Sequence, residues 1–194
     1  MPWPKDHKTK TREKIVTAAA AAFRRRGVSG VGVEEIMANA GLTHGGFYSH
    51  FGSKEELLGA ALDQASDETI VHLSKALESG DRERRLPGVI DAYLSSEHAA
   101  HPEHGCPVAA LGPEVARAGG KARRDLARGV RDRLAWMRGL LPGKSRQRTR
   151  EDDAIGVLAC MVGGLILARL ANGKDSSEIL EACRDFLHRA VDER

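Results

Sequence analysis

The sequence predicts an all-α fold of about nine helices, and three observations support this prediction. Apolar residues recur at the i, i+3, i+4, i+7 spacing of a helical face along most of the chain. Long stretches rich in Ala, Leu, Glu and Arg are separated by glycines, and only seven prolines occur in 194 residues. Runs of alternating β-branched residues, which are typical of strands, are missing. With 41% hydrophobic and 29% charged residues, the chain can build a proper core.

The N-terminal quarter is basic and contains two predicted helices after a loose arm at residues 1–8. The first helix covers residues 9–26 and ends in Arg24-Arg25-Arg26, which is either a solvated helix end or a contact for phosphate. The second helix covers residues 33–40, with Gly32 as its N-cap. Residues 1–55 carry nine Lys/Arg and five Asp/Glu, whereas the remainder of the chain has a net charge of −1. The basic excess indicates a phosphate-bearing partner for this quarter.

Residues 41–57 combine a turn, a short helix and the start of a new helix. Gly41 can adopt the left-handed conformation that ends the second helix. Thr43 is the predicted N-cap of a third helix that continues to Phe51. Gly45 and Gly46 leave the exposed face of this helix bare at its start, so DNA can approach the backbone closely. The stretch is therefore interpreted as the second half of a helix-turn-helix motif.

Three segments of this stretch resemble the DNA-binding signature of the tetracycline-repressor (TetR) family. They are Ala40-Gly41-Leu42-Thr43, Phe47-Tyr48-Ser49-His50-Phe51 and Ser53-Lys54-Glu55-Glu56-Leu57. The chain departs from the family at Gly32, where Thr or Ser is usual, so a hydroxyl that can touch phosphate is absent there. The resemblance implies a three-helix DNA-binding domain at residues 1–52 and a helical ligand-binding and dimerisation domain at residues 53–194.

The resemblance and the shortness of the third helix together indicate which residues contact DNA. Phe47 and Phe51 are spaced i, i+4 and take the buried face, which leaves the other side chains more exposed. Tyr48 and Lys54 match family positions that touch phosphate, and His44 lies nearest the base edges. Packing within the domain is the alternative role for the aromatic and histidine side chains. The predicted DNA-binding set is Thr43, His44, Gly45, Gly46, Tyr48, His50 and Lys54.

The rest of the chain is divided by glycines and prolines into six further predicted helices. Ser53 and Glu56 form a capping box for a long helix of about 40 Å. Asp175 and Glu178 form a second capping box, at the start of the last helix. The predicted helices cover residues 53–79, 86–100, 106–120, 121–141, 147–172 and the segment from 175 onward, with a loop over 99–105.

The last two helices carry more apolar surface than one subunit needs. The uncharged apolar run 154–168 has fifteen residues, including Gly163 and Gly164, and is short of the ~20 residues that span a bilayer. We therefore expect no membrane partner, and a two-fold homodimer in which these helices form a four-helix contact. The N-terminus lacks the apolar core of a signal peptide, so the expected location is the cytoplasm.

The cysteines and a histidine-rich loop are open to more than one interpretation. Cys106, Cys160 and Cys183 form neither a disulfide framework nor a Cys-x-x-Cys pair. Cys106 precedes Pro107 at a predicted helix start, so it is either a reactive sensor thiol or an inert packed one. Metal-ligand residue types occur nearby, but their spacing matches no standard metal module, so we expect a polar loop and neither metal nor cofactor. These residues are Glu97, His98, His101, Glu103 and His104.

The sequence lacks the short motifs of common enzymes, including Gly-x-Ser-x-Gly, the phosphate loop and His-Glu-x-x-His. With the resemblance, this predicts a non-enzymatic homodimeric repressor that leaves an inverted-repeat operator on double-stranded DNA when a small-molecule inducer binds or a thiol is modified. The alternative keeps DNA binding but makes the C-terminal domain a dimerisation or partner-binding module without a ligand. The 4% aromatic content leaves few residues for a ligand-binding lining. The candidates are Tyr93, Cys106, Trp136, Met137 and Met161.

Overall fold

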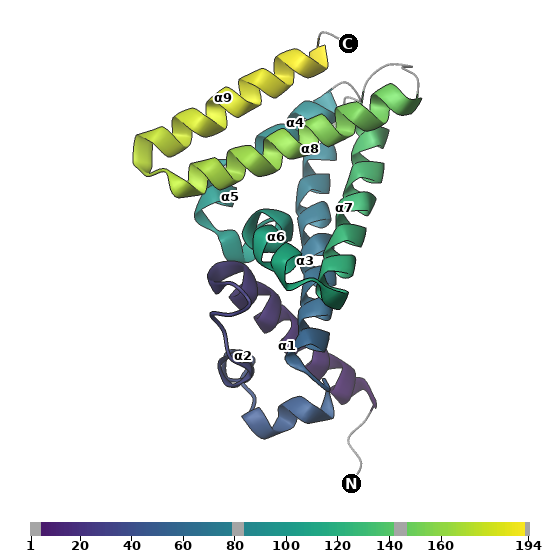
Figure 1. Cartoon of the computed structure of the whole chain (residues 1–194), viewed down its shortest axis with the longest axis vertical. Coiled ribbons are helices and arrows are strands. Elements are labelled where there is room, and N and C mark those ends of the chain that lie inside the picture. Colours follow the sequence, from purple (N-terminus) through teal and green to yellow (C-terminus); the bar gives the residue numbers. More distant parts are fainter. Residues whose placement is uncertain (1–4, 79–83, 142–146, 193–194) are drawn as a thin grey trace. The chain divides into compact units, whose positions relative to one another are not determined.

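The computed structural model describes residues 5–78, 84–141 and 147–192. Within these ranges the protein has nine α-helices, short 3₁₀ helices and no strand, which confirms the predicted all-α fold (Figure 1). The α-helices are α1 (Lys5–Arg26), α2 (Val33–Asn39), α3 (Lys54–Ser74), α4 (Arg85–Tyr93), α5 (Ser96–Ala100), α6 (Pro107–Ala118), α7 (Gly120–Leu140), α8 (Gln147–Leu170) and α9 (Gly173–Asp192). The 3₁₀ helices are η1 (His44–Ser49), η2 (Lys75–Leu77) and η4 (Pro102–His104).

The chain divides into two compact units, each built from two segments. Unit 1 comprises Met1–Asp67 and Pro102–Ala127, and unit 2 comprises Glu68–His101 and Arg128–Arg194. Helices α3 and α7 each contribute residues to both units. The compact units therefore do not divide at the predicted boundary between residues 52 and 53, which stays a prediction about function.

Unit 1 is built around the apolar faces of α1 and the first half of α3. Ile15, Ala19 and Phe23 on α1 are fully buried, as is Leu57 on α3. Phe47 and Phe51 complete this core from η1 and the residues after it. Apolar residues of α6 and α7 join the same cluster, so the helix-turn-helix segment packs on residues that come much later in the chain.

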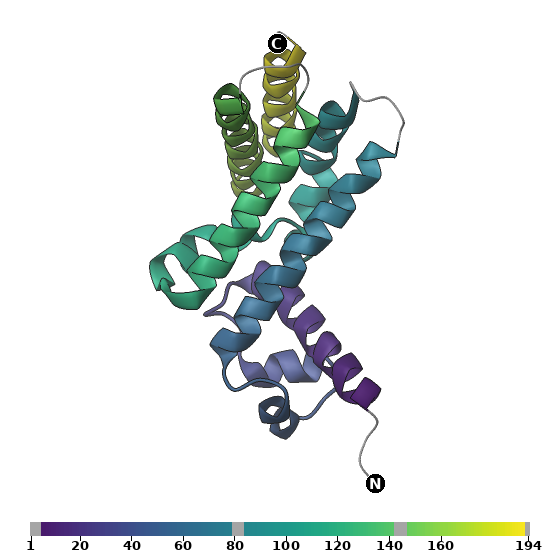
Figure 2. The ribbon, with the colours of Figure 1, turned by 90° about the vertical axis from the view of Figure 1, so that its right-hand side faces the viewer.

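Unit 2 contains the long antiparallel pair α8 and α9, which lie side by side in both views (Figure 1, Figure 2). Gly164 on α8 is where the helices meet closely: a Cβ built there would lie 2.8 Å from the Cys183 Sγ on α9 and 3.2 Å from the Leu94 Cδ2. Glycine at this position lets the end of α4 and both long helices share one contact.

The predicted helix over residues 86–100 is wrong, because the structure breaks it into α4 and α5. Leu94 leaves the helical conformation, with φ −91° and ψ 45°, and Ser95 is extended. The Ser95 hydroxyl accepts a hydrogen bond from the His98 N–H at 3.1 Å and donates one to the Ala92 carbonyl at 3.0 Å. Ser95 thus caps the new helix, which is the role its side chain favours.

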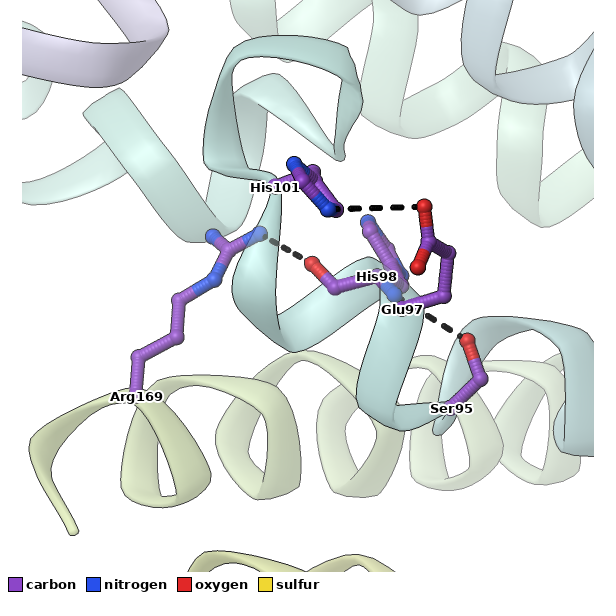
Figure 3. A network of polar contacts seen from close by, with 5 residues as sticks. All are labelled: Ser95, Glu97, His98, His101 and Arg169. Atoms are coloured by element: carbon purple, nitrogen blue, oxygen red, sulfur yellow. Dashed lines mark hydrogen bonds and ion pairs between the residues drawn. The ribbon is translucent and has the colours of Figure 1, made fainter. Parts of the chain in front are cut away.

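Two arginines from the long helices hold the carbonyl groups at this break. The Arg184 guanidinium donates to the Leu94 carbonyl at 2.5 Å. The Arg169 guanidinium donates to the carbonyls of His98, at 2.8 Å, and Ala99, at 3.3 Å (Figure 3). Because α5 is short, these cations satisfy carbonyls that have no partner within the helix.

Other predicted helix ends are also corrected. Helix α1 begins at Lys5, so the predicted loose arm over residues 1–8 is helical from residue 5 onward. The last helix starts at Gly173, two residues before Asp175, and Glu178 pairs with Lys174 at 3.1 Å instead of closing a capping box. The Ser53 box is confirmed in one half: Ser53 Oγ accepts from the Glu56 N–H at 3.1 Å, while the Glu56 carboxylate accepts from the Gly52 N–H at 2.8 Å.

Helix α8 is long and apolar enough over Thr149–Leu170 to cross a bilayer by length and composition alone. The argument from the length of the apolar run is therefore insufficient. Its packing is informative instead, because Ala154, Met161 and Leu165 are fully buried and α8 packs against α9, α4 and α5. These contacts bury one side of α8, and 39% of its apolar window is buried within the chain.

Candidate nucleic-acid interface

The segment after α2 is a tight turn followed by a 3₁₀ helix. Gly41 has φ 70°, the left-handed conformation predicted for it, and the Leu42 N–H donates to the Met37 carbonyl at 2.9 Å. Thr43 occupies the N-cap position with φ −81° and ψ 148°, but its hydroxyl makes no capping hydrogen bond. The predicted helix to Phe51 is instead η1, which ends at Ser49. The predicted hydroxyl cap is therefore wrong, although the helix begins where expected.

Phe47 and Phe51 anchor η1 to the core of unit 1. Both side chains are buried, and their rings stack with centroids 5.9 Å apart. The Arg12 guanidinium on α1 lies 4.5 Å from the centre of the Phe51 ring, a cation–π contact. The anchored face leaves the opposite side of η1 in solvent, as the i, i+4 spacing predicts.

Thr43, His44 and Tyr48 form the exposed side of η1, and 69% of the Tyr48 surface is exposed. The His44 and Tyr48 rings meet edge to face, with centroids 6.2 Å apart. A Cβ added to Gly45 would meet no atom within 4 Å, whereas one added to Gly46 would lie 3.6 Å from the Met37 Cε. Gly45 thus provides open backbone, and Gly46 also provides room for α2.

His50 is less exposed than the sequence suggests. Its side chain is half-buried, and its Nδ1 is shielded from solvent without a hydrogen-bond partner among the residues that the structure describes. Burial, followed by the positive charges of Lys8, Arg12 and His7, lowers the pKa of His50 below 6.5. His50 thus lies near cations of α1, and its contact with DNA stays a prediction.

Lys54 also takes part in the fold. Its Nζ donates to the Val28 carbonyl at 2.6 Å and lies 5.8 Å from the centre of the Phe23 ring. The side chain remains half-exposed. An ammonium group has three N–H donors, so one bond to Val28 leaves donors for a phosphate oxygen.

The turn between α1 and α2 is held by Glu114 of α6, a residue that the sequence analysis did not identify. The Glu114 carboxylate accepts the N–H groups of Val28 and Ser29, both at 2.9 Å, and the Ser29 hydroxyl at 2.7 Å. Burial alone would raise the pKa of Glu114, but these hydrogen bonds and the charge of Arg117 lower it overall. The local sequence contains no signal for this contact, because Glu114 lies 86 positions after Val28 and 85 positions after Ser29.

The arginine run at the end of α1 has three different environments. Arg24 is buried and donates to the carbonyls of Ala20 and Gly105, both at 3.0 Å. Arg26 pairs with Glu35 of α2. Arg25 is exposed. Two of the three arginines therefore stabilise the fold. Neither of the two predicted roles, a solvated helix end or a phosphate contact, describes all three.

The predicted ligand-lining residues are mostly interior. Tyr93, Met137 and Met161 in unit 2 are fully buried, and Trp136 is half-buried. The Tyr93 ring packs edge-on against His98, with centroids 4.6 Å apart. Cys106 belongs to unit 1 and is fully buried. Their assignment to a ligand site stays a prediction.

A cavity of about 190 Å³ lies elsewhere in unit 2, between α8, α9 and the end of α7. Val157, Phe186 and Leu187 provide apolar walls, and Arg150 and Asp153 provide charge. None of the five predicted ligand residues lines it. The cavity is smaller than the roughly 300–1,000 Å³ usual for drug-sized ligands.

The histidine-rich segment does not gather as a metal site in the part of the chain that the structure describes, where no three His, Cys, Asp or Glu side chains form such a group. Instead, Glu97 pairs with His101 at 3.5 Å (Figure 3), and the His98 side chain is buried. The His98 Nδ1 lies 2.6 Å from the Tyr93 carbonyl.

The N-terminal part of the chain, which includes this candidate interface, is similar in sequence to known proteins. The sequence model of the family described as bacterial regulatory proteins, tetR family, matches residues 15–61 of the chain. HTH-type transcriptional regulator TtgR of Pseudomonas putida is 43% identical over 77 residues, which are 40% of this chain and 36% of that protein. The match thus spans little more than a third of the relative's length.

Solved structures resemble the chain over nearly its whole length. A TetR transcriptional regulator from Chloroflexus aurantiacus J-10-FL has a TM-score of 0.82 at 24% identity, covering 97% of this chain and 98% of that one. AibR in complex with isovaleryl coenzyme A and operator DNA has a TM-score of 0.63 at 17% identity, covering 91% and 97%. At these identities the similarity shows the fold.

Proposed function

Because this chain belongs to the TetR family of bacterial regulatory proteins, we propose that it is a homodimeric repressor that binds an inverted-repeat operator on double-stranded DNA. The observation that carries this proposal is the exposed Thr43-His44-Gly45 start of η1, held in place by buried Phe47 and Phe51. Such a helix end, with open backbone at Gly45, suits close approach to a major groove.

The residues of this surface have two proposed roles. Tyr48 and Lys54 hold phosphate, and Thr43 and His44 face the base edges, with Gly45 and Gly46 between them. His50, directly after η1, completes the proposed DNA-binding set beside Lys8 and Arg12 of α1. In a two-fold dimer the two η1 helices enter successive major grooves, so the half-sites lie about 34–36 Å apart.

The test starts with recovery of genomic DNA fragments by the purified protein, followed by binding measurements at several salt concentrations. His44→Ala is expected to cost about 1–3 kcal/mol on the preferred site and little on random DNA. Lys54→Ala is expected to weaken both and to lower the salt slope by about one unit per subunit. His104→Ala, which changes an exposed histidine outside the surface, is the matched control.

A Gly45 variant tests the close approach directly. A Cβ at Gly45 meets nothing within 4 Å, so we expect Gly45→Val to leave the packing of unit 1 unchanged. We expect it to abolish operator binding while the unfolding transition stays in place. Operator affinity equal to that of the native protein in both His44→Ala and Gly45→Val would exclude η1 as the reading element.

We also infer that a small-molecule inducer acts through unit 2 of a cytoplasmic protein, and that the protein has no catalytic role. The family consists of transcriptional regulators, and AibR was solved with both a ligand and operator DNA. A ligand that favours a larger separation of the two η1 helices must weaken operator binding by the same coupling free energy. The modest 190 Å³ cavity favours a second candidate, in which unit 2 only dimerises. Thermal-shift screening against lipophilic compounds distinguishes the two.

A further inference from the structure

Cys160 on α8 and Cys183 on α9 face each other within one chain. Cys183 is the neighbouring group that, after burial, raises the pKa of Cys160. Gly164 follows Cys160 by one helical turn and therefore lies on the same face of α8. A Cβ built on Gly164 would lie 2.8 Å from the Cys183 Sγ and 3.2 Å from its Cβ. Both sulfur atoms thus occupy the same contact between the helices.

The close approach at Gly164 is what makes a covalent link feasible. Packed helices usually lie about 8–10 Å apart, and a disulfide requires Cα atoms about 4.4–6.8 Å apart. A side chain at position 164 would hold α9 away, whereas glycine lets the Cys183 side chain rest on the backbone of α8. The Cys183 sulfur therefore lies against α8 one helical turn after Cys160.

The two thiols are also the ones that a small oxidant can reach. Cys160 and Cys183 are half-buried, whereas Cys106 is fully buried. Cys106 was the sensor candidate from sequence, because it precedes Pro107 at the start of α6. Its burial makes it the less accessible of the three thiols.

We propose that Cys160 and Cys183 form a reversible intrachain disulfide that ties α8 to α9, with a peroxide as the oxidant. One thiolate attacks a peroxide oxygen, so the O–O bond breaks, the sulfur becomes a sulfenic acid and water or an alcohol leaves. The second thiol then attacks the sulfenic sulfur, forms the S–S bond and releases water. The two sulfurs lose two electrons in all, and the peroxide takes them up.

The surroundings of Cys160 make the oxidation of this cysteine pair slow. Burial, together with the neighbouring Cys183 thiol, raises the pKa of Cys160 to about 11. Since the thiolate is the reacting form, the pair responds to sustained exposure to peroxide rather than to traces. A dithiol reductant reverses the reaction by thiol–disulfide exchange.

The test treats the full-length native protein with hydrogen peroxide, blocks remaining thiols with iodoacetamide and maps the peptides by mass spectrometry. We expect a linked Cys160–Cys183 peptide pair, about 2 Da lighter than the sum of the reduced peptides, that dithiothreitol separates. Cys106 should remain a free thiol, which iodoacetamide alkylates once the treated protein is denatured. A link involving Cys106, a link between two chains, or oxidation of Cys160 and Cys183 to separate sulfinic acids would each overturn the proposal.

Cysteine variants test the pairing as well. The conclusion does not depend on any single variant being folded. Cys160→Ser and Cys183→Ser should each lose the mass change, and Cys106→Ser should retain it. If Cys160→Ser still loses about 2 Da on oxidation, the partner of Cys183 is a different thiol and the assignment fails. The mapping of the native protein is independent of these variants.

Discussion

Burial and a hydrogen bond shift the pKa of the His98 imidazole in opposite directions. Burial lowers its pKa, and the bond to the Tyr93 carbonyl raises it. The charges of Arg169, His72 and Arg133 lower it further, and the resulting pKa is about 4. The imidazole is therefore neutral at pH 7, with its Nδ1–H donating to Tyr93.

This residue should make stability depend on pH in a defined direction. Because the folded pKa is about 4 and the ordinary value is 6.5, the unfolded chain takes up the proton first as the pH falls. Stability is fully present above pH 6.5 and is lost toward pH 4, by about 1.4 kcal/mol per pH unit and about 3 kcal/mol in all. Urea unfolding of the native protein and of His98→Gln at several pH values measures this difference. Parallel pH profiles for the two proteins would contradict it.

At the scale of the element, two adjacent glycines of α8 have different roles. Both lie in the apolar run 154–168 of a helix that the sequence predicts to form the contact between subunits. In the structure Gly164 is enclosed by Cys183 and Leu94 of its own chain, whereas a Cβ at Gly163 would meet nothing within 4 Å. Gly164 therefore serves packing within the chain, and only Gly163 lies open to a partner.

Alanine at each position separates these roles. Gly164→Ala forces the Cys183 side chain, 2.8 Å from the new Cβ, to move, and should cost about 1–3 kcal/mol of unfolding free energy. Gly163→Ala should raise helix stability by about 0.5–1 kcal/mol in the isolated chain, since Ala has the higher helix propensity. Urea unfolding at fixed protein concentration checks both. Equal effects of the two changes would show that α8 and α9 do not pack closely at Gly164.

At the scale of the whole molecule, α8 and α9 expose large apolar side chains that a single chain leaves in water. Exposed fractions are 55% for Leu167, 77% for Leu170 and 57% for Phe186. We expect these helices to form the homodimer contact, because burying this surface in a two-fold four-helix arrangement is favourable.

Charge placed on this surface should prevent dimerisation. Leu167→Glu and Phe186→Glu are each expected to give monomers, because a carboxylate buried without a partner is unfavourable. Val71→Glu is the matched control, since Val71 on α3 is also an exposed apolar residue. Sedimentation equilibrium gives the mass, and operator binding should fall with it because one subunit contacts only one half-site. A dimer mass in both variants would place the contact elsewhere.

The sequence by itself determined the all-α class, the turn at Gly41, the buried Phe47 and Phe51 and the exposed side of η1. These features depend on helical periodicity and on the conformations open to glycine, which act between residues close in the chain. They also carry the family resemblance, so a large part of the candidate DNA surface was predictable.

Only the tertiary structure decided the roles that depend on distant residues. The Glu114 carboxylate holds the Val28 turn from 86 positions away, and Lys54 divides its donors between Val28 and solvent. Cys183 lies against Gly164, one helical turn after Cys160, because α9 packs along α8. The 3₁₀ form of η1 and the break at Leu94 also follow from packing and local hydrogen bonds that periodicity does not encode. Such contacts are set by which helices pack together, and a local pattern contains no information about the partner.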